Sequence, residues 1–215
     1  MSTADLDRAV AHYRDLAPRY DHFTRRINDV RVRAVEALRL RPGEVVVDAG
    51  CGTGWCFSKL AAAVGRGGRL IGFDPSPDML AMARTRLDPS SLPKAELIRA
   101  TAEEVQLPAP ADAILFSYTH DLIRSRRALA NLLRQARPRA RVAATGTKLY
   151  SPWLFPANWY LRYSHRGYIT NFEGFDAPWT LLEELLEDFH VDTNGTTQHY
   201  IATGRVPAAA RPQDA

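Results

Sequence analysis

The spacing of apolar residues along this chain changes near residue 43, from helical periodicity to short continuous runs. Upstream of that point, apolar positions three or four residues apart predict two amphipathic helices. Pro18 separates the two helices, and Pro42-Gly43 ends the second one. We therefore expect residues 1–42 to form a helical cap. The apolar positions are Leu6, Val10 and Tyr13 in the first helix and Ile27, Val30, Val32, Val35 and Leu38 in the second.

Downstream, apolar runs of strand length alternate with helical segments, which predicts a mostly parallel sheet covered on both faces. The expected strands are Glu44–Asp48, Arg69–Asp74, Ala95–Thr101, Ala113–Tyr118 and Arg141–Thr145, with a closing pair at Val191–Asn194 and Gln198–Thr203. The expected helices are Trp55–Val64, Ser76–Leu87, Arg126–Arg137 (ended by Pro138) and Pro178–Asp188. The prediction is an α/β doubly wound fold with seven strands, in one domain over residues 1–206. The Ala/Pro-rich residues 207–215 are expected to be disordered.

The most informative segment is VVVDAGCGTGW, at residues 45–55. A strand that runs into Gly50, Gly52 and Gly54 and then into a helix lets a ligand approach the backbone at the carboxyl edge of the sheet. One strand later, RLIGFDPS places Asp74 at a strand tip, where its carboxylate can accept hydrogen bonds from both hydroxyls of a ribose.

Two ligand classes use such a loop. Dinucleotide-binding enzymes require G-x-G-x-x-G, but Trp55 stands at the third glycine position. Tryptophan there obstructs the close packing of a pyrophosphate loop. Asp48, directly before the loop, instead suits a ligand with an amino acid end and a cationic amine. The pattern therefore favours a ligand with an amino acid end over a dinucleotide.

DAGCGTG followed by GFDPSPDML resembles the first two motifs of class I S-adenosylmethionine-dependent methyltransferases, and the order of elements over about residues 44–204 agrees. APRYD at residues 17–21 resembles the YD segment of the ubiquinone/menaquinone-type and related small-molecule methyltransferases. The resemblance implies a Rossmann-like fold and S-adenosylmethionine as the methyl donor.

The resemblance also implies roles for individual residues in binding that cofactor. The loop residues would contact its methionine part, Asp74 its ribose, and the carbonyl of Ser117 its amine. Where the family usually reads G-D-A-E, this chain has Arg99-Ala100-Thr101-Ala102-Glu103, so adenine recognition would depend on backbone groups or the Thr101 hydroxyl. The implied cofactor-binding residues are Asp48, Gly50, Cys51, Gly52, Asp74, Pro75, Met79, Thr101, Ala102, Ser117 and Tyr20.

The fourth strand ends in FSYTHD, which brings Tyr118, His120 and Asp121 to the edge where ligands bind. If the acceptor is a hydroxyl or a protonated amine, a base must take its proton, and His120 titrates near neutral pH. His120, Tyr118 and His22 are the candidate catalytic residues, although a His-Asp pair is also a common helix cap. For three other histidines, His12, His190 and His199, we expect surface or packing roles.

An aromatic segment follows the fifth strand, with seven aromatic residues in Tyr150–Tyr168. We place an acceptor-covering insert at residues 148–176, in which aromatic side chains would wall a pocket. Contact with a membrane interface and packing of an extra helix are the alternatives. The candidate substrate-binding residues are Trp153, Trp159, Tyr160 and Tyr163, together with Phe155.

The composition of the chain excludes several classes of protein and kinds of site. Hydrophobic residues make up 46% and charged residues 24%, as in ordinary globular domains. No apolar run approaches the ~20 residues of a membrane-spanning helix, and the start of the chain has no apolar signal core, so a cytoplasmic protein without stable membrane insertion is expected. Cys51 and Cys56 are the only cysteines, which excludes a disulfide framework and a zinc site, and no metal cofactor is expected.

The predicted function is methyl transfer from S-adenosylmethionine to a small molecule, with an aromatic or heteroaromatic acceptor such as a phenol or indole. The alternative is a quinone or lipid-headgroup methyltransferase that works at a membrane surface. A net charge of +4 does not require a nucleic-acid partner, and Ser117-Tyr118-Thr119-His120 lacks the Asn/Asp-Pro-Pro-aromatic signature of amino-group modification on nucleic acids. A non-catalytic cofactor-binding subunit is disfavoured because the loop glycines and Asp74 are intact.

Overall fold

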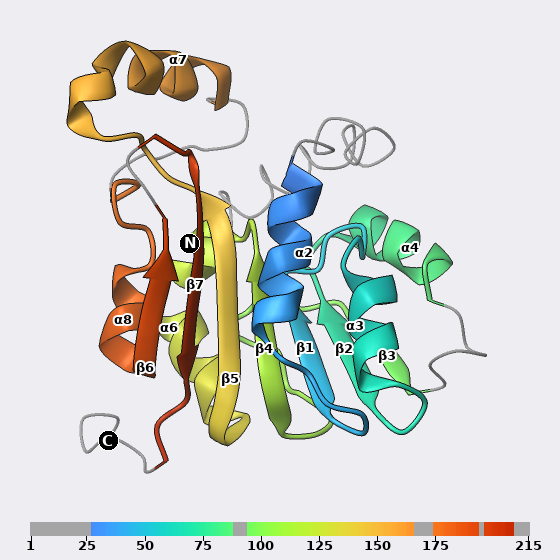
Figure 1. The fold of residues 1–215 in the computed structure, drawn as a ribbon. Helices are drawn as coiled ribbons and strands as arrows, with labels where there is room; N and C mark the ends of the chain where they lie inside the picture. Colours follow the sequence, from blue (N-terminus) through green and yellow to red (C-terminus); the bar gives the residue numbers. More distant parts are fainter. Residues whose placement is uncertain (1–26, 88–93, 166–173, 194–195, 209–215) are drawn as a thin grey trace.

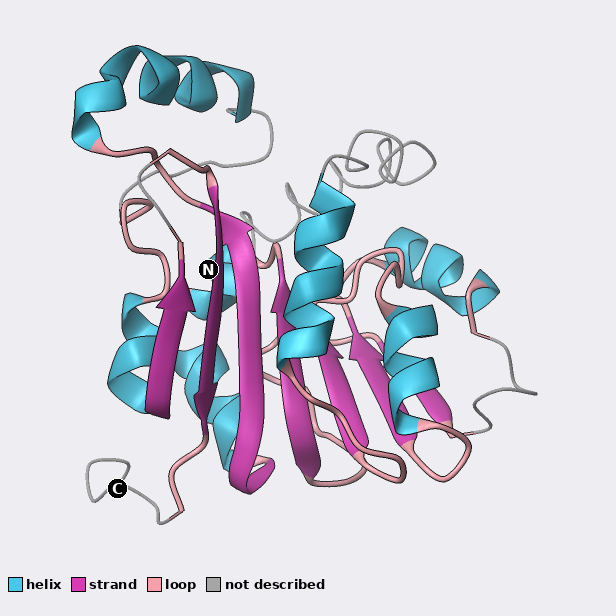
Figure 2. Ribbon diagram, in the orientation of Figure 1, coloured by secondary structure: helices cyan, strands magenta, loops and turns pink. Residues whose placement is uncertain are grey.

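The computed structural model describes residues 27–87, 94–165, 174–193 and 196–208, and these form a single sheet with helices on both faces (Figures 1 and 2). The seven strands lie in the order β3-β2-β1-β4-β5-β7-β6. All pairings are parallel except those of β7, which runs antiparallel to β5 and β6. The strands are β1 (Val45–Ala49), β2 (Arg69–Phe73), β3 (Ala95–Ile98), β4 (Ala111–Ser117), β5 (Ala136–Thr147), β6 (Glu187–Asp192) and β7 (His199–Arg205).

The helices cover the two faces of the sheet, which confirms the predicted doubly wound fold. The helices α2, α3 and α4 pack on one face, and α6 and α8 pack on the other. Consecutive strand residues point to opposite faces, so Val46 joins the first core and Val47 the second. The helices are α2 (Asn28–Ala37), α3 (Phe57–Val64), α4 (Pro77–Thr85), α5 (His120–Ile123), α6 (Arg126–Arg134), α7 (Phe155–His165) and α8 (Thr180–Leu185), with a 3-10 turn η2 at Pro152–Leu154.

Local sequence signals explain where two of these helices begin. Ser76 accepts a hydrogen bond from the Met79 N–H at 3.3 Å and starts α4. Ser125 accepts one from the Ala128 N–H at 3.2 Å and starts α6. A side-chain oxygen at such a position satisfies a backbone donor that has no partner inside the helix.

Two predicted helices end too late, and the strands that follow them begin earlier than predicted. The helix predicted over Arg126–Arg137 ends at Arg134, because β5 already begins at Ala136 and contains Pro138. The helix predicted over Pro178–Asp188 ends at Leu185, and β6 occupies Glu187–Asp192. Pairing with β7 extends β6 toward its start beyond what its own residues indicate. The other strands match their predictions to within a few residues.

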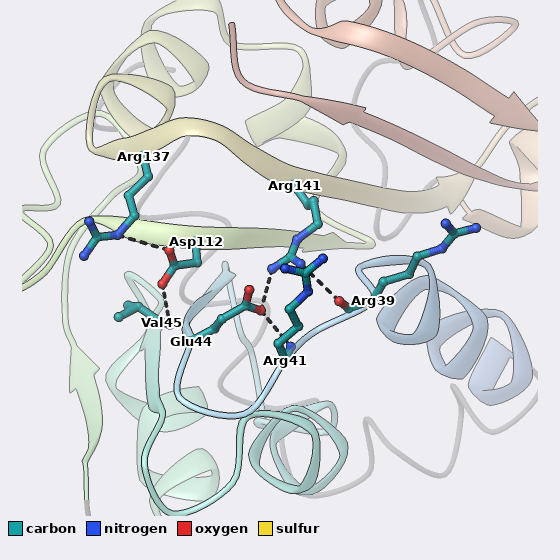
Figure 3. Close-up of polar contacts among 7 residues, drawn as sticks. All are labelled: Arg39, Arg41, Glu44, Val45, Asp112, Arg137 and Arg141. Carbon is teal, nitrogen blue, oxygen red and sulfur yellow. Dashed lines mark hydrogen bonds and ion pairs between the residues drawn. The ribbon is translucent and has the colours of Figure 1, made fainter. Parts of the chain in front are cut away.

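The amino edge of the sheet is held by side chains that bond to backbone groups (Figure 3). Glu44 accepts hydrogen bonds from the Arg41 backbone N–H and from the Arg141 guanidinium. Asp112 accepts one from the Val45 N–H at 2.9 Å. These bonds connect the first residues of β1 and β4 to β5 at the edge opposite the glycine loop.

Helix α7 lies beyond the carboxyl end of β5, on the side of the sheet that holds β7 and β6 (Figure 1). The Asn158 side chain bonds to both the N–H and the carbonyl of Tyr150, at 2.8 and 3.0 Å, and so attaches the helix to the segment that leaves β5. In the described part of the chain, no helix has the length and apolar character needed to cross a membrane.

Candidate functional site

The loop between β1 and α3 depends on its glycines for two different reasons. Gly50, Gly52 and Gly54 all have positive φ angles, of 65°, 53° and 73°. A Cβ atom at Gly50 would lie 2.7 Å from the Thr119 methyl carbon, and one at Gly54 would lie 2.7 Å from the Phe57 ring. Around the Cβ position of Gly52 there is nothing within 4 Å. Two glycines therefore allow close packing, and the third leaves exposed backbone for a ligand to approach.

Asp74, just after β2, is hydrogen-bonded to this loop. Its two carboxylate oxygens accept the backbone N–H of Gly52 at 3.0 Å and of Ser76 at 2.8 Å. Burial raises the pKa of Asp74 to about 6, while these two hydrogen bonds act in the opposite direction. The loop after β1 and the acid after β2 thus form one unit at the carboxyl edge of the sheet.

Asp48 lies beneath the same loop, with 2% of its surface exposed. Burial raises its pKa to about 7, the Arg31 charge lowers it, and Asp74 raises it further. A carboxyl group with a pKa this far from its ordinary value is typical of a ligand-binding or catalytic site.

Arg31 is a site residue that our sequence analysis did not identify. It is on α2 and only 4% exposed, and its guanidinium carbon lies 5.3 Å from the Trp55 ring centre and 5.5 Å from that of Tyr118. These are cation–π distances. The available signal was its position, since Arg31 shares the buried face of α2 with Ala34 and Val35.

Tyr118 directly follows β4 and adopts a strained backbone conformation, with φ of +60°. Its N–H donates to the Thr145 carbonyl at 2.8 Å, and its Oη lies 3.1 Å from Nδ1 of His199. The antiparallel direction of β7 makes this contact possible, because it pairs His199 with Thr147 at the carboxyl end of β5. The sequence had predicted only a surface or packing role for His199.

His120 packs against the end of β5. Its Nε2 accepts the Thr147 N–H at 3.5 Å, and its ring centre lies 5.0 Å from that of Phe175. A Cβ atom at Gly146 would lie 2.7 Å from the imidazole, so glycine there makes room for the ring. Burial also raises the pKa of the neighbouring Asp121. The catalytic role of His120 stays a prediction.

The other predicted cofactor residues fall on the same edge of the sheet. Cys51, Met79 and Ala102 are buried, and Ser117 ends β4. The Thr101 hydroxyl donates to Glu104 at 3.1 Å. Tyr20 and His22 lie outside the described residues. Both cysteines are free, and burial raises the pKa of each thiol.

The predicted substrate-binding aromatics lie on η2 and α7 and are exposed. Trp159 and Tyr163, one helical turn apart, stack with ring centres 5.9 Å apart. Leu161, on the opposite side of the helix, is buried. Their role as pocket walls stays a prediction. The exposed fractions are 70% for Trp153, 73% for Phe155, 69% for Trp159, 66% for Tyr160 and 53% for Tyr163.

Comparison with known proteins agrees with this geometry. Residues 46–139 match the methyltransferase domain family. A solved DhpI–SAH complex superposes with a TM-score of 0.65 at 19% identity and covers 97% of this chain and 100% of that one. The N-methyltransferase NodS from Bradyrhizobium japonicum superposes with a TM-score of 0.58 at 16% identity, over 84% and 97% of the two chains. Residues 46–139 therefore belong to a methyltransferase domain, and the chain shares its fold with these two solved structures.

Curated relatives match about a third of this chain. A demethylmenaquinone methyltransferase from Bacillus mycoides is 33% identical over 75 residues, which is 35% of this chain and 32% of that protein. An uncharacterised 37.1 kDa protein in a Streptomyces fradiae transposon is 44% identical over 63 residues, which is 29% of this chain and 18% of that protein. The matched segments therefore span less than a third of these relatives.

Proposed function

We propose that this methyltransferase domain transfers a methyl group from S-adenosylmethionine to a small molecule with an aromatic ring. The observation that carries the proposal is the hydrogen bond between Gly52 and Asp74, which unites the glycine loop with the acid after β2. The strained Tyr118 lies beside that unit and supplies a polar group where an acceptor would arrive.

The residues around the loop fit the nucleoside part of the cofactor. Each carboxylate oxygen accepts more than one hydrogen bond, so the bonds that Asp74 makes to Gly52 and Ser76 leave capacity for two ribose hydroxyls. Pro75 and Met79 would flank the adenine. The open space over Gly52 allows the ligand to approach the backbone.

The amino acid end of the cofactor fits a pair of opposite charges. Asp48 suits its ammonium group, with a carbonyl from Ser117 as a second acceptor. Arg31, buried between two aromatic rings, suits its carboxylate. An ammonium group beside Asp48 would also lower the pKa that burial raises, so binding and deprotonation of Asp48 would occur together.

When bound, S-adenosylmethionine supplies an electrophilic methyl group on a sulfonium. The protein then has to exclude water, align the acceptor and accept a proton where the acceptor is a hydroxyl. Tyr118 and His120 lie at the edge where this alignment would occur.

A second candidate is an acceptor held in a membrane, such as a quinol. The specific observation in its favour is the exposed aromatic face of η2 and α7. Residues 148–172 contain Lys148, Arg162 and Arg166 but neither aspartate nor glutamate. Tryptophan, tyrosine and basic residues together suit an interface with anionic lipid. The menaquinone-type relatives support the same candidate.

Release of S-adenosylhomocysteine with a divided acceptor panel tests both candidates. One half holds soluble phenols, indoles and amines, and the other holds quinols and lipid headgroups in vesicles. Turnover confined to the soluble half supports the first candidate, and turnover confined to vesicles supports the second. Binding of S-adenosylmethionine without turnover on any acceptor would contradict both.

A further inference from the structure

The contact between Tyr118 and His199 joins two residues that are 81 positions apart in the sequence. Tyr118 leaves β4 and His199 begins β7, and both lie at the carboxyl edge of the sheet because β7 is antiparallel. The hydroxyl-to-imidazole distance of 3.1 Å is that of a hydrogen bond.

Three further contacts hold the Tyr118 side chain in this place. Its backbone is fixed with φ of +60° by the bond from its N–H to the Thr145 carbonyl. The Arg31 guanidinium lies over its ring at 5.5 Å, and the His120 ring meets it edge-on at 6.2 Å. A non-glycine residue in this backbone region costs of order 1–3 kcal/mol, and such residues cluster at functional sites.

The Tyr118–His199 pair also borders the cofactor loop. Thr119, the next residue, lies so close to Gly50 that a Cβ atom there would be 2.7 Å from its methyl carbon. The Arg31 guanidinium lies over both the Tyr118 ring and the ring of Trp55, the last residue of the loop. The pair therefore lies next to the cofactor side of the site.

We propose that Tyr118 and His199 form a proton relay that accepts the proton of a hydroxyl acceptor during methyl transfer. The inference rests on the proposed function. The acceptor oxygen forms a bond to the methyl carbon as the carbon–sulfur bond breaks with its electron pair left on sulfur. The acceptor proton passes to Tyr118 Oη, the phenolic proton passes to His199 Nδ1, and the imidazole becomes imidazolium.

In this relay Tyr118 touches the acceptor, so it is the catalytic residue, and His199 acts through it. The charged and titratable groups around the pair are Arg31 from α2, His120 from α5 and Lys148 after β5. The Lys148 backbone N–H donates to the Gln198 carbonyl at 2.8 Å, and its ammonium group donates to the Leu149 carbonyl at 3.1 Å.

Nuclear magnetic resonance of the His199 imidazole nitrogens in the cofactor-free protein tests the pair without relying on activity. The relay requires the Tyr118 hydroxyl to donate to Nδ1, so the neutral ring should hold its own proton on Nε2, which lies 3.5 Å from the Gln198 side-chain nitrogen. Tyr118→Phe should shift the ring toward a mixture of the two tautomers and change its pKa. An unchanged tautomer and an unchanged pKa in that variant would overturn the pair.

Kinetics with His199→Asn test the relay itself. Asparagine keeps a polar group close to the position of Nδ1 but does not titrate, so kcat should fall roughly 100-fold with little change in KM. The limb of the pH–rate profile that belongs to His199 should disappear. His190→Asn, an exposed histidine on β6, is the matched control and should behave like the wild type.

The outcomes separate failure of the relay from failure of the proposed function. Full kcat with a wild-type pH profile in His199→Asn would overturn the relay alone. Absence of turnover by the wild type on every acceptor, with the cofactor bound, would overturn the proposed function together with the role of the relay in it.

Discussion

Gly52 donates its backbone N–H to Asp74 Oδ2 at 3.0 Å, so the loop after β1 is held by the acid after β2. The same carboxylate is proposed to bind the ribose. Cofactor binding and the shape of the loop should therefore respond together to any change at Asp74.

Asp74→Ala should weaken S-adenosylmethionine binding by about 10-fold or more, because hydrogen bonds to a charged group contribute about 1.5–3 kcal/mol. Isothermal titration calorimetry measures this change directly. The control is Asp192→Ala, which removes an exposed carboxylate that pairs with Arg33. Equal affinities for the wild type and the Asp74 variant would contradict the assigned site.

Gly50→Ala should destabilise the fold more than Gly65→Ala. Both glycines have positive φ, 65° and 63°, and Gly65 combines it with ψ of −175°, so each substitution carries a backbone cost of order 1–3 kcal/mol. Only at Gly50 does the new methyl group clash with a neighbour, and overpacking adds about 1–3 kcal/mol. Thermal unfolding of the two variants gives the difference. Equal unfolding temperatures would show that Thr119 moves aside freely.

Asp48 should make the protein less stable as the pH rises from about 4 to about 7. Its pKa is about 7 in the folded state and near 3.8 in the unfolded state, so the folded state retains the proton through this range. Stability is then full below pH 4 and falls as the pH passes the folded-state pKa. Asp74, with a pKa of about 6, contributes in the same direction.

Asp48→Asn removes the titration and keeps the shape of the side chain. Urea unfolding at pH 5 and pH 8 should show a smaller loss of stability for this variant than for the wild type. The same loss in both proteins would mean that Asp48 does not retain its proton in the folded state.

If α7 meets a membrane, the double variant Phe155→Ser/Trp159→Ser should lose sedimentation with anionic vesicles. Both side chains are about 70% exposed, so their removal should leave the unfolding temperature nearly unchanged. The matched control, Phe155→Tyr/Trp159→Phe, keeps the rings and should still sediment. A change from dimer to monomer in the serine variant would identify a second copy of the chain as the partner instead.

Local sequence signals predict the cofactor side of this site well. The glycine loop, Asp74 and the Ser76 cap each depend on neighbours within a few residues, so pattern and structure agree there. The acceptor side depends on distant segments. Arg31 and His199 meet Tyr118 only through packing of α2 and the antiparallel direction of β7, which short-range patterns do not encode.

The error in the predicted boundary between α8 and β6 has a related cause. Glu187 and Asp188 continue a segment predicted to be helical, yet pairing with β7 makes them the start of a strand. The pairing partner lies beyond them in the chain, so tertiary contacts outweigh local propensity.

The direction of β7 also has a practical consequence for immobilisation. Val206, just after that strand, donates its N–H to the Ala140 carbonyl, so the chain leaves the sheet at the amino edge. An attachment through the C-terminal residues would therefore hold the protein from that side. The glycine loop and α7 would then face the solution, accessible to dissolved acceptors and to vesicles alike.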